Sequence, residues 1–272
     1  MTRITIIGAA GRMGQAIIRC ARTLKDISVT GAVEQAGHPA INKDAGVLAG
    51  IGKIGINIGD DLRQALKHSN VLIDFTIHSA VPQNAIIASK LGIPMVIGTT
   101  GLSLSETGRI RQAAKKIPIV LAPNMSLGVN LLFAIVRKSA SVLGAGYTAE
   151  IDETHHIHKK DAPSGTALRL GEKIAEGRKI DFRKAMMHNP KSRNAGKLSE
   201  GSAGKDKIII RSHRIGETVG DHTVKFENKG EKIELSHHAH TRDALAQGAI
   251  CAAKWAAKRK PGLYDMQDVL GL

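Results

Sequence analysis

Apolar positions in the first 125 residues fall into short continuous runs, separated by segments with helical spacing. The runs predict buried strands over residues 2–7, 27–33, 54–58, 71–75, 94–97 and 117–121. The segments between them predict helices over residues 11–24, 60–68 and 104–116, and a further helix that Pro82 opens. Strands that alternate with helices are typical of a parallel sheet with helices on both faces. We therefore predict a doubly wound α/β domain for residues 1–126.

The pattern changes after Asn124. An apolar stripe at helical spacing runs from Leu127 to Leu143, and a strand pattern follows at residues 148–154. The remainder predicts a helix over 164–177, a long polar loop over 178–206, and strands over 207–214, 222–228 and 232–237. We predict a second α+β domain over residues 127–241, with an open and mainly antiparallel sheet. An alanine-rich helix follows at 242–258, and we expect residues 242–272 to pack back on the first domain.

The first predicted strand leads directly into a glycine-rich loop and then a helix. The loop is Gly8-Ala9-Ala10-Gly11-Arg12-Met13-Gly14, with the spacing G-x-x-G-x-x-G instead of the commoner G-x-G-x-x-G. Glycines there permit a tight turn and let backbone N–H groups approach a pyrophosphate. Glu34 ends the second strand, 20 residues after Gly14, where an acid reaches the ribose hydroxyls of a dinucleotide. The alternative is a plain strand–turn–helix with a solvated Glu34. We favour a Rossmann-type cofactor site that uses Glu34 and the loop residues from Gly8 to Met13.

Two further loops follow predicted strands of the first domain. They are Gly98-Thr99-Thr100-Gly101 and Ala122-Pro123-Asn124-Met125. Open parallel sheets bind ligands at the carboxyl ends of their strands. Although each loop alone is more often only a turn, we take Gly98, Thr99, Thr100 and the four residues from Ala122 to Met125 as candidates for the nicotinamide side of the cofactor.

The densest chemistry lies between residues 153 and 166. The segment is Glu153-Thr154-His155-His156-Ile157-His158-Lys159-Lys160-Asp161-Ala162-Pro163-Ser164-Gly165-Thr166. Ser164, Gly165 and Thr166 open a helix and can offer hydroxyl and N–H groups to a carboxylate. Lys159 is a cation that can donate a proton, and His155 can act as acid or base near neutral pH. The alternative is a capped helix that follows a solvated basic loop.

A second histidine cluster precedes the last helix. His237-His238-Ala239-His240 leads to Arg242, which can pair with a substrate carboxylate or simply form a surface ion pair. Neither cluster is accompanied by cysteine, and the sequence has no His-Glu-x-x-His motif. We therefore expect no metal site.

Charge and composition narrow the class of protein. The chain of 272 residues has a net charge of +15, and residues 159–214 carry 15 Lys and Arg against 6 Asp and Glu. Such an excess suits nucleic acid or anionic metabolites, but an aromatic content of 3% argues against base stacking. No apolar run is long enough to span a membrane, no secretory signal is evident, and two cysteines fit a reducing cytoplasm. A small anionic substrate is the expected partner, with neither nucleic acid nor membrane. The rival classes are a nucleic-acid-binding protein, a zinc hydrolase, and a semialdehyde dehydrogenase, which would need a reactive thiolate.

These motifs together resemble the dihydrodipicolinate reductase family, also called 4-hydroxy-tetrahydrodipicolinate reductases. The matching segments, which extend along nearly the whole chain, are Gly8–Gly14, Asp74-Phe75-Thr76, 96–101, 124–130, His155-His156 with Lys159, 161–167 and 265–270. The resemblance implies that NADH or NADPH reduces a cyclic, conjugated imine-type dicarboxylate to tetrahydrodipicolinate, in lysine biosynthesis through diaminopimelate. It also implies catalytic roles for His155 and Lys159, substrate binding by His156, Gly165 and Thr166, and a homotetramer assembled through the second-domain sheet.

One residue departs from the pattern of the family. Many members place arginine directly after the ribose-binding acid, where it can pair with the 2′-phosphate of NADPH, whereas this chain has Gln35 after Glu34. Glu34 should repel that phosphate, and Gln35 has no charge to offset the repulsion. We expect a preference for NADH, although Arg12 or a nearby lysine could compensate.

Overall fold

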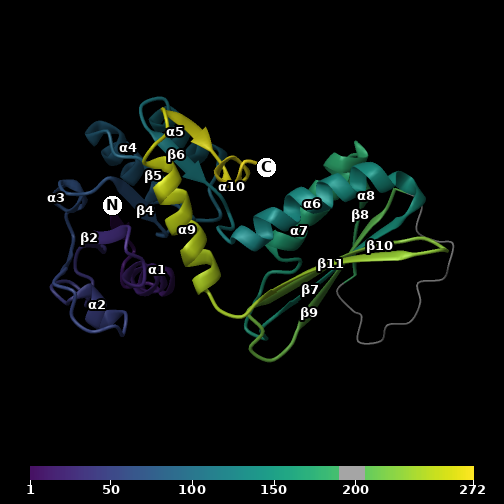
Figure 1. Ribbon diagram of the computed structural model, residues 1–272, viewed down its shortest axis with the longest axis horizontal. Helices are drawn as coiled ribbons and strands as arrows, with labels where there is room; N and C mark the ends of the chain where they lie inside the picture. Colours follow the sequence, from purple (N-terminus) through teal and green to yellow (C-terminus); the bar gives the residue numbers. More distant parts are fainter. Residues whose placement is uncertain (190–205) are drawn as a thin grey trace. The chain divides into compact units, whose positions relative to one another are not determined.

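The chain forms two compact units in the computed structural model, which describes residues 1–189 and 206–272. Unit 1 comprises Met1–Leu127 and Arg242–Leu272, and unit 2 comprises Gly128–Thr241. Most of the loop expected at 178–206 lies outside the described residues. Each unit has its own sheet (Figure 1). Each also has its own buried apolar side chains.

Unit 1 is built on a seven-stranded sheet in which every pairing is parallel. Its strands, in spatial order, are β12 (Gly262–Tyr264), β6 (Pro118–Leu121), β5 (Met95–Ile97), β4 (Val71–Asp74), β1 (Thr2–Ile7), β2 (Ile27–Val33) and β3 (Ile58–Gly59). Ile4, Leu72 and Val96 in the central strands have no exposed surface. The continuous apolar runs are therefore explained by burial on both faces. The strand order reverses between β1 and β4, where such sheets bind ligands.

Helices cover both faces of this sheet. They are α1 (Arg12–Arg22), α2 (Ala45–Leu48), α3 (Leu62–Leu66), α4 (Val81–Leu91), α5 (Leu104–Ala114), α9 (Asp243–Ala256) and α10 (Met266–Leu270). One core contains residues of α1 and α9, and the other contains residues of α3, α4 and α5. The composition of α9 follows from close packing, since a Cβ on its Gly248 would lie 1.7 Å from the Met125 carbonyl oxygen. The helix expected at 242–258 thus packs within unit 1.

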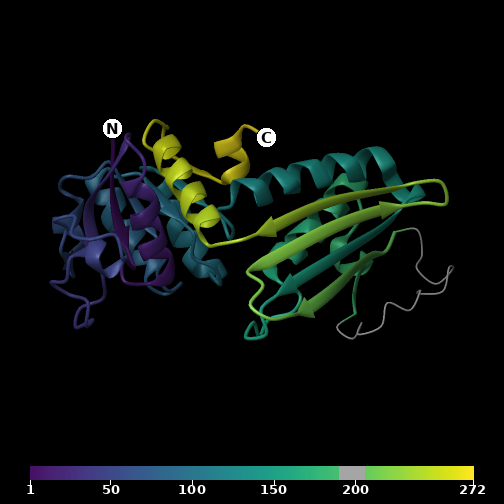
Figure 2. The same cartoon turned by 60° about the horizontal axis from the view of Figure 1, so that its bottom comes forward.

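Unit 2 is a five-stranded sheet with helices on one face (Figure 2). The strand order is β11 (Lys232–Ala239), β10 (Gly220–Glu227), β7 (Thr148–His155), β9 (Ile208–Arg214) and β8 (Met186–Asn189). The helices are α6 (Leu127–Leu143), α7 (Gly165–Arg178) and α8 (Phe182–Ala185), with a 3₁₀ turn at Gly144–Gly146. Val136 of α6, Leu170 of α7 and Val224 of β10 share one core.

The second sheet is mixed, whereas the sequence predicted a mainly antiparallel one. β10 pairs antiparallel with β7 and β11, but β9 pairs parallel with β7 and β8. The reason is that β7 and β8 are joined through α7, and a helical crossover returns the chain to a parallel strand. Short β8 falls in the stretch that was expected to be a loop.

The weak strand predicted at 54–58 is reduced to β3. The N–H groups of Ile54 and Gly55 donate to the Asp44 carboxylate, at 3.1 and 2.7 Å, and not to a neighbouring strand. The sequence also gave no signal for β12, which extends the sheet beyond β6.

One described segment, Leu127–Gly146, has the length and apolar composition of a membrane span. Its Val129, Leu132 and Phe133 pack into the core of unit 2.

Candidate active site

The glycine-rich loop joins β1 to α1. Gly8 has a φ of +79°, a conformation that side chains disfavour. A Cβ on Gly14 would lie 2.3 Å from the Gly8 carbonyl oxygen, so only glycine allows α1 to start this close to the strand. Gly11 precedes α1 and has no side chain to cap it. The first-turn N–H groups of α1 are therefore available to an anion.

The loop lines a cavity of about 810 Å³ in unit 1. The carboxyl ends of β1, β2 and β4 meet there and contribute Gly8, Glu34 and Phe75. Ala10 N–H donates to Glu34 at 2.7 Å, which places that carboxylate beside the loop. The size of the cavity, the uncapped start of α1 and the adjacent carboxylate fit the phosphates and ribose of a dinucleotide.

The other predicted cofactor residues differ in exposure. Arg12 is exposed, Met13 is half-buried and Ala9 is buried. Thr99 is buried and donates to the Thr76 carbonyl at 2.9 Å, while Gly98 lies against the Phe75 ring and Thr100 is exposed. In the last loop Ala122 and Met125 are buried, Asn124 accepts from Ser126 N–H at 2.9 Å, and Pro123 is exposed.

Sequence reasoning missed part of the cavity wall. His38, Asp60, Asp61, Arg63 and Thr76 also line it. Asp61 caps α3, accepting from Arg63 N–H at 2.8 Å, so the cap signal was visible but its position in the cavity was not.

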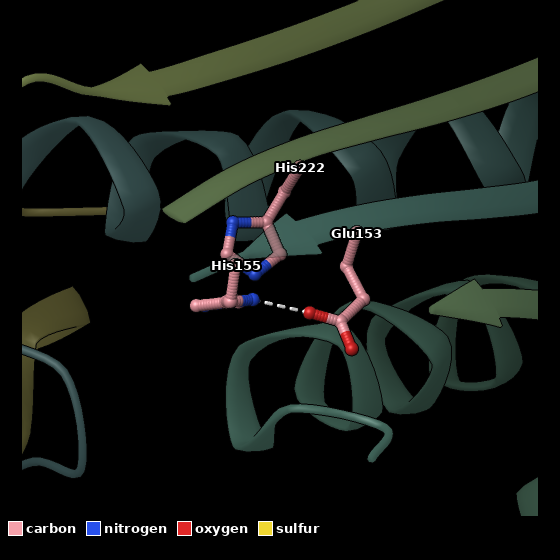
Figure 3. Close-up of side chains that lie close together, drawn as sticks. All are labelled: Glu153, His155 and His222. Carbon is pink, nitrogen blue, oxygen red and sulfur yellow. Dashed lines mark hydrogen bonds and ion pairs between the residues drawn. The ribbon is translucent and has the colours of Figure 1, made fainter. Parts of the chain in front are cut away.

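In unit 2 a buried polar network surrounds His155. Glu153 and His155 lie two residues apart on β7 and therefore on the same face. Figure 3 shows their side chains pointing toward one another, with His222 of β10 beside them. His155 Nδ1 is hydrogen-bonded to Glu153 Oε2, and the His155 and His222 rings pack edge to face at 5.2 Å.

Burial and hydrogen bonding act in opposite directions on Glu153. Burial raises the pKa of its carboxyl, but hydrogen bonds from His155, Ser212 and Arg214 outweigh that effect and lower the pKa to about 2. Burial, followed by the electrostatic effect of the neighbouring His155, lowers the pKa of His222 to about 3. At neutral pH the network therefore holds a carboxylate and a neutral His222.

These three residues, the one cluster of potential metal ligands in the described part of the chain, offer ligand atoms within 4.8 Å of one another. Within this cluster, Glu153 Oε2 and His155 Nδ1 are hydrogen-bonded to each other.

Ser164 belongs to this network, although the sequence placed it against the substrate. Its hydroxyl accepts from Ala167 N–H and pairs with His222 Nε2, both at 3.2 Å, and only 2% of the residue is exposed. Its N–H donates to Glu153 Oε1 at 3.2 Å. Ser164 thus fixes the start of α7, while Gly165 is exposed and Thr166 is half-buried.

Lys159 lies in the loop after β7. Its Nζ is 2.8 Å from the Asp161 carboxylate. Arg214 of β9 donates to the Lys159 carbonyl at 3.3 Å, to Glu153 Oε1 at 3.1 Å and to the Asp161 carbonyl. The structure thus joins the loop of Lys159 to the network of His155.

The remaining predicted residues lie around these elements. His156 is half-buried and its Nδ1 has no partner among the described residues. Arg242 is exposed at the start of α9, in unit 1. Glu153 could have been recognised as a site residue from its spacing to His155. His222 and Arg214 could not, because only the pairing of β10 and β9 with β7 places them in this network.

The fold and these two sites define a two-domain oxidoreductase with a nucleotide-binding first domain. The family models "Dihydrodipicolinate reductase, N-terminus" and "Dihydrodipicolinate reductase, C-terminus" match residues 2–125 and 128–270. The chain belongs to the dihydrodipicolinate reductase family.

Named relatives and solved structures align with this chain over nearly its full length. The 4-hydroxy-tetrahydrodipicolinate reductase of Anaeromyxobacter dehalogenans (strain 2CP-1) is 47% identical over 272 residues, covering 100% of this chain and 98% of that protein. The one of Geotalea uraniireducens is 45% identical, covering 100% of both. Among solved structures, a dipicolinate-bound dihydrodipicolinate reductase from Paenisporosarcina has a TM-score of 0.74 at 23% identity, with 98% of each chain covered. An amine dehydrogenase from Mycobacterium smegmatis shares the fold, with a TM-score of 0.64 at 12% identity and coverage of 96% and 94%.

Proposed function

We propose that this chain catalyses the 4-hydroxy-tetrahydrodipicolinate reductase reaction in lysine biosynthesis through diaminopimelate. A hydride passes from NAD(P)H to a cyclic imine-type dicarboxylate, which gives tetrahydrodipicolinate. The observation that carries the proposal is the full-length identity of 41–47% to relatives with this activity in their names. A cytoplasmic homotetramer that uses NADH in preference to NADPH completes the proposal.

NAD(P)H, when bound, supplies the hydride, and the side chains of the protein handle the charge that follows. Addition of hydride to a conjugated C=C–C=N system moves an electron pair toward the ring nitrogen. Lys159 stabilises that negative charge and donates the proton, while His155 acts as the acid/base partner. His156 and the α7 start at Gly165 and Thr166 bind the substrate carboxylates. Arg242 is a further candidate partner for a carboxylate.

Two substitutions test the catalytic roles. We expect His155→Ala and Lys159→Ala each to lower kcat by about 100-fold, because each removes a positioned proton-transfer group. The measurement is NADH oxidation with the freshly generated upstream product as substrate. Lys160→Ala is the matched control, since Lys160 is exposed and adjacent to Lys159. Near-normal turnover in both site variants would contradict the mechanism.

A further inference from the structure

We propose that Glu153 and Arg214 are positioning residues for the reaction. Glu153 orients His155, and Arg214 ties the carboxylate of Glu153 to the loop that carries Lys159. The inference rests on the proposed function, in which His155 and Lys159 act on the substrate.

Glu153 decides which nitrogen of His155 faces outward. It is fully buried and ionised, so its oxygens can only accept hydrogen bonds. Nδ1 of His155 must therefore carry the hydrogen that binds Glu153, which leaves Nε2 for the reaction. Gly220 of β10 lies against this nitrogen, because a Cβ there would be only 3.1 Å from His155 Nε2.

Arg214 reaches Glu153 and Lys159 from 61 and 55 residues away in the sequence. It stands opposite His155 in the register of β7 and β9. Its guanidinium donates to Glu153 and to the carbonyls of Lys159 and Asp161. A planar fork of donors can hold a carboxylate and a loop backbone at once, which a lysine cannot do.

Two reactive groups on different elements are therefore held in place by the same pair of side chains. His155 ends a strand, whereas Lys159 lies in a loop without regular structure. Productive geometry needs both to be held within a fraction of an ångström. Arg214 and Glu153 supply that restraint together.

Glu153→Gln tests the orienting role with little change in size. We expect kcat to fall about 10- to 100-fold while KM changes less than about threefold, because the amide has no charge and can present a donor to Nδ1. The kcat–pH profile should also change, because the substitution removes a negative charge that is hydrogen-bonded to His155. The charged or titratable groups that remain in the network are Arg214, Lys159 with its partner Asp161, and neutral His222.

Arg214 and Gly220 provide variants that do not alter the buried carboxylate. Arg214→Lys keeps the charge but loses the fork, so kcat should fall about tenfold. Gly220→Ala should also lower kcat, by crowding Nε2, and it keeps the test informative if Glu153→Gln does not fold. Glu172→Gln is the control, since Glu172 is a surface carboxylate of unit 2 paired with Arg169 at 2.7 Å. It should keep wild-type kcat and pH profile.

A spectroscopic readout separates this inference from the proposed function. Histidine ring ¹⁵N shifts, with the His155 signals assigned by their loss in His155→Ala, should show a protonated Nδ1 tautomer in the full-length wild type at alkaline pH. Glu153→Gln should lose that preference. A wild type inactive on the substrate but with this tautomer would contradict the proposed function and support the positioning of His155. A wild type with protonated Nε2, or unchanged kcat and pH profiles in both Glu153→Gln and Arg214→Lys, would overturn the inference.

Discussion

A few charged side chains determine the charge of the cofactor cavity wall. Glu34, Asp60 and Asp61 place three carboxylates in its wall, against the cations of Arg63 and, when protonated, His38. The sequence pointed to Glu34 because an acid at the end of the second strand has a known partner in the ribose. It gave no reason to group Asp60 and Asp61 with it, since they follow β3, whose position beside β2 is a matter of sheet topology. The acidic wall supports the proposed preference for NADH.

Gln35→Arg tests this preference. An arginine there would add a cation beside Glu34, where a 2′-phosphate would approach. We expect kcat/KM for NADPH to rise about tenfold or more relative to NADH, with little change for NADH itself. Gln64→Arg adds the same charge at an exposed position of α3 and serves as the control. Higher kcat/KM with NADPH than with NADH in the wild type would already contradict the proposed preference.

At the scale of elements, long patterns predicted strands well and short ones poorly. β1 and β2 begin and end where the apolar runs do. β12 has three half-exposed residues and forms only because β6 offers an edge. The network of unit 2 depends in the same way on pairing, because His222 lies directly opposite Glu153 in the register of β10 and β7.

Acid should destabilise this part of the molecule. The pKa of His222 is lowered to about 3, below its usual value of 6.5, so the unfolded chain binds the extra proton first. Stability is then lost as pH falls from about 6.5 toward 3. The lowered pKa of Glu153 adds a further loss between about 4.5 and 2. Denaturant unfolding at pH 7 and pH 4 should differ by on the order of 2–3 kcal/mol from His222.

His222→Gln is the test, since glutamine does not titrate and can still bind the Ser164 hydroxyl. The difference between the two pH values should shrink in this variant, whereas His68→Gln, an exposed histidine of unit 1, should leave it unchanged. An equal pH dependence in wild type and His222→Gln would contradict the assignment of a buried neutral histidine.

At the scale of the whole molecule, the face of the second sheet that its helices do not cover is relevant to how subunits assemble. The face away from α6 and α7 carries ion pairs of Asp152 with Lys225 at 2.9 Å and of Glu150 with Arg211. Such a ladder of paired charges suits an interface that is more polar than a core. We propose that the homotetramer assembles through this sheet.

The expected assembly has four times the chain mass of 28.9 kDa. Light scattering coupled to size exclusion at micromolar concentration measures it directly. Lys225→Glu should shift the mass downward, because it leaves Asp152 and Glu234 facing a third negative charge. Lys116→Glu, an exposed site in unit 1, should not. A monomeric wild type would rule out the tetramer.

The sequence by itself determined the parallel sheet, the glycine-rich loop with Glu34, and the segment from His155 to Thr166. These features are local: strand and helix periods, a turn that needs glycine, and reactive residues a few positions apart all appear in neighbouring letters. Only the tertiary structure decided that Ser164 faces inward, that the second sheet is mixed, and that Glu153, His222 and Arg214 surround His155. Those contacts come from strand pairing between segments about 60 residues apart, because register, and not local preference, fixes which side chains meet.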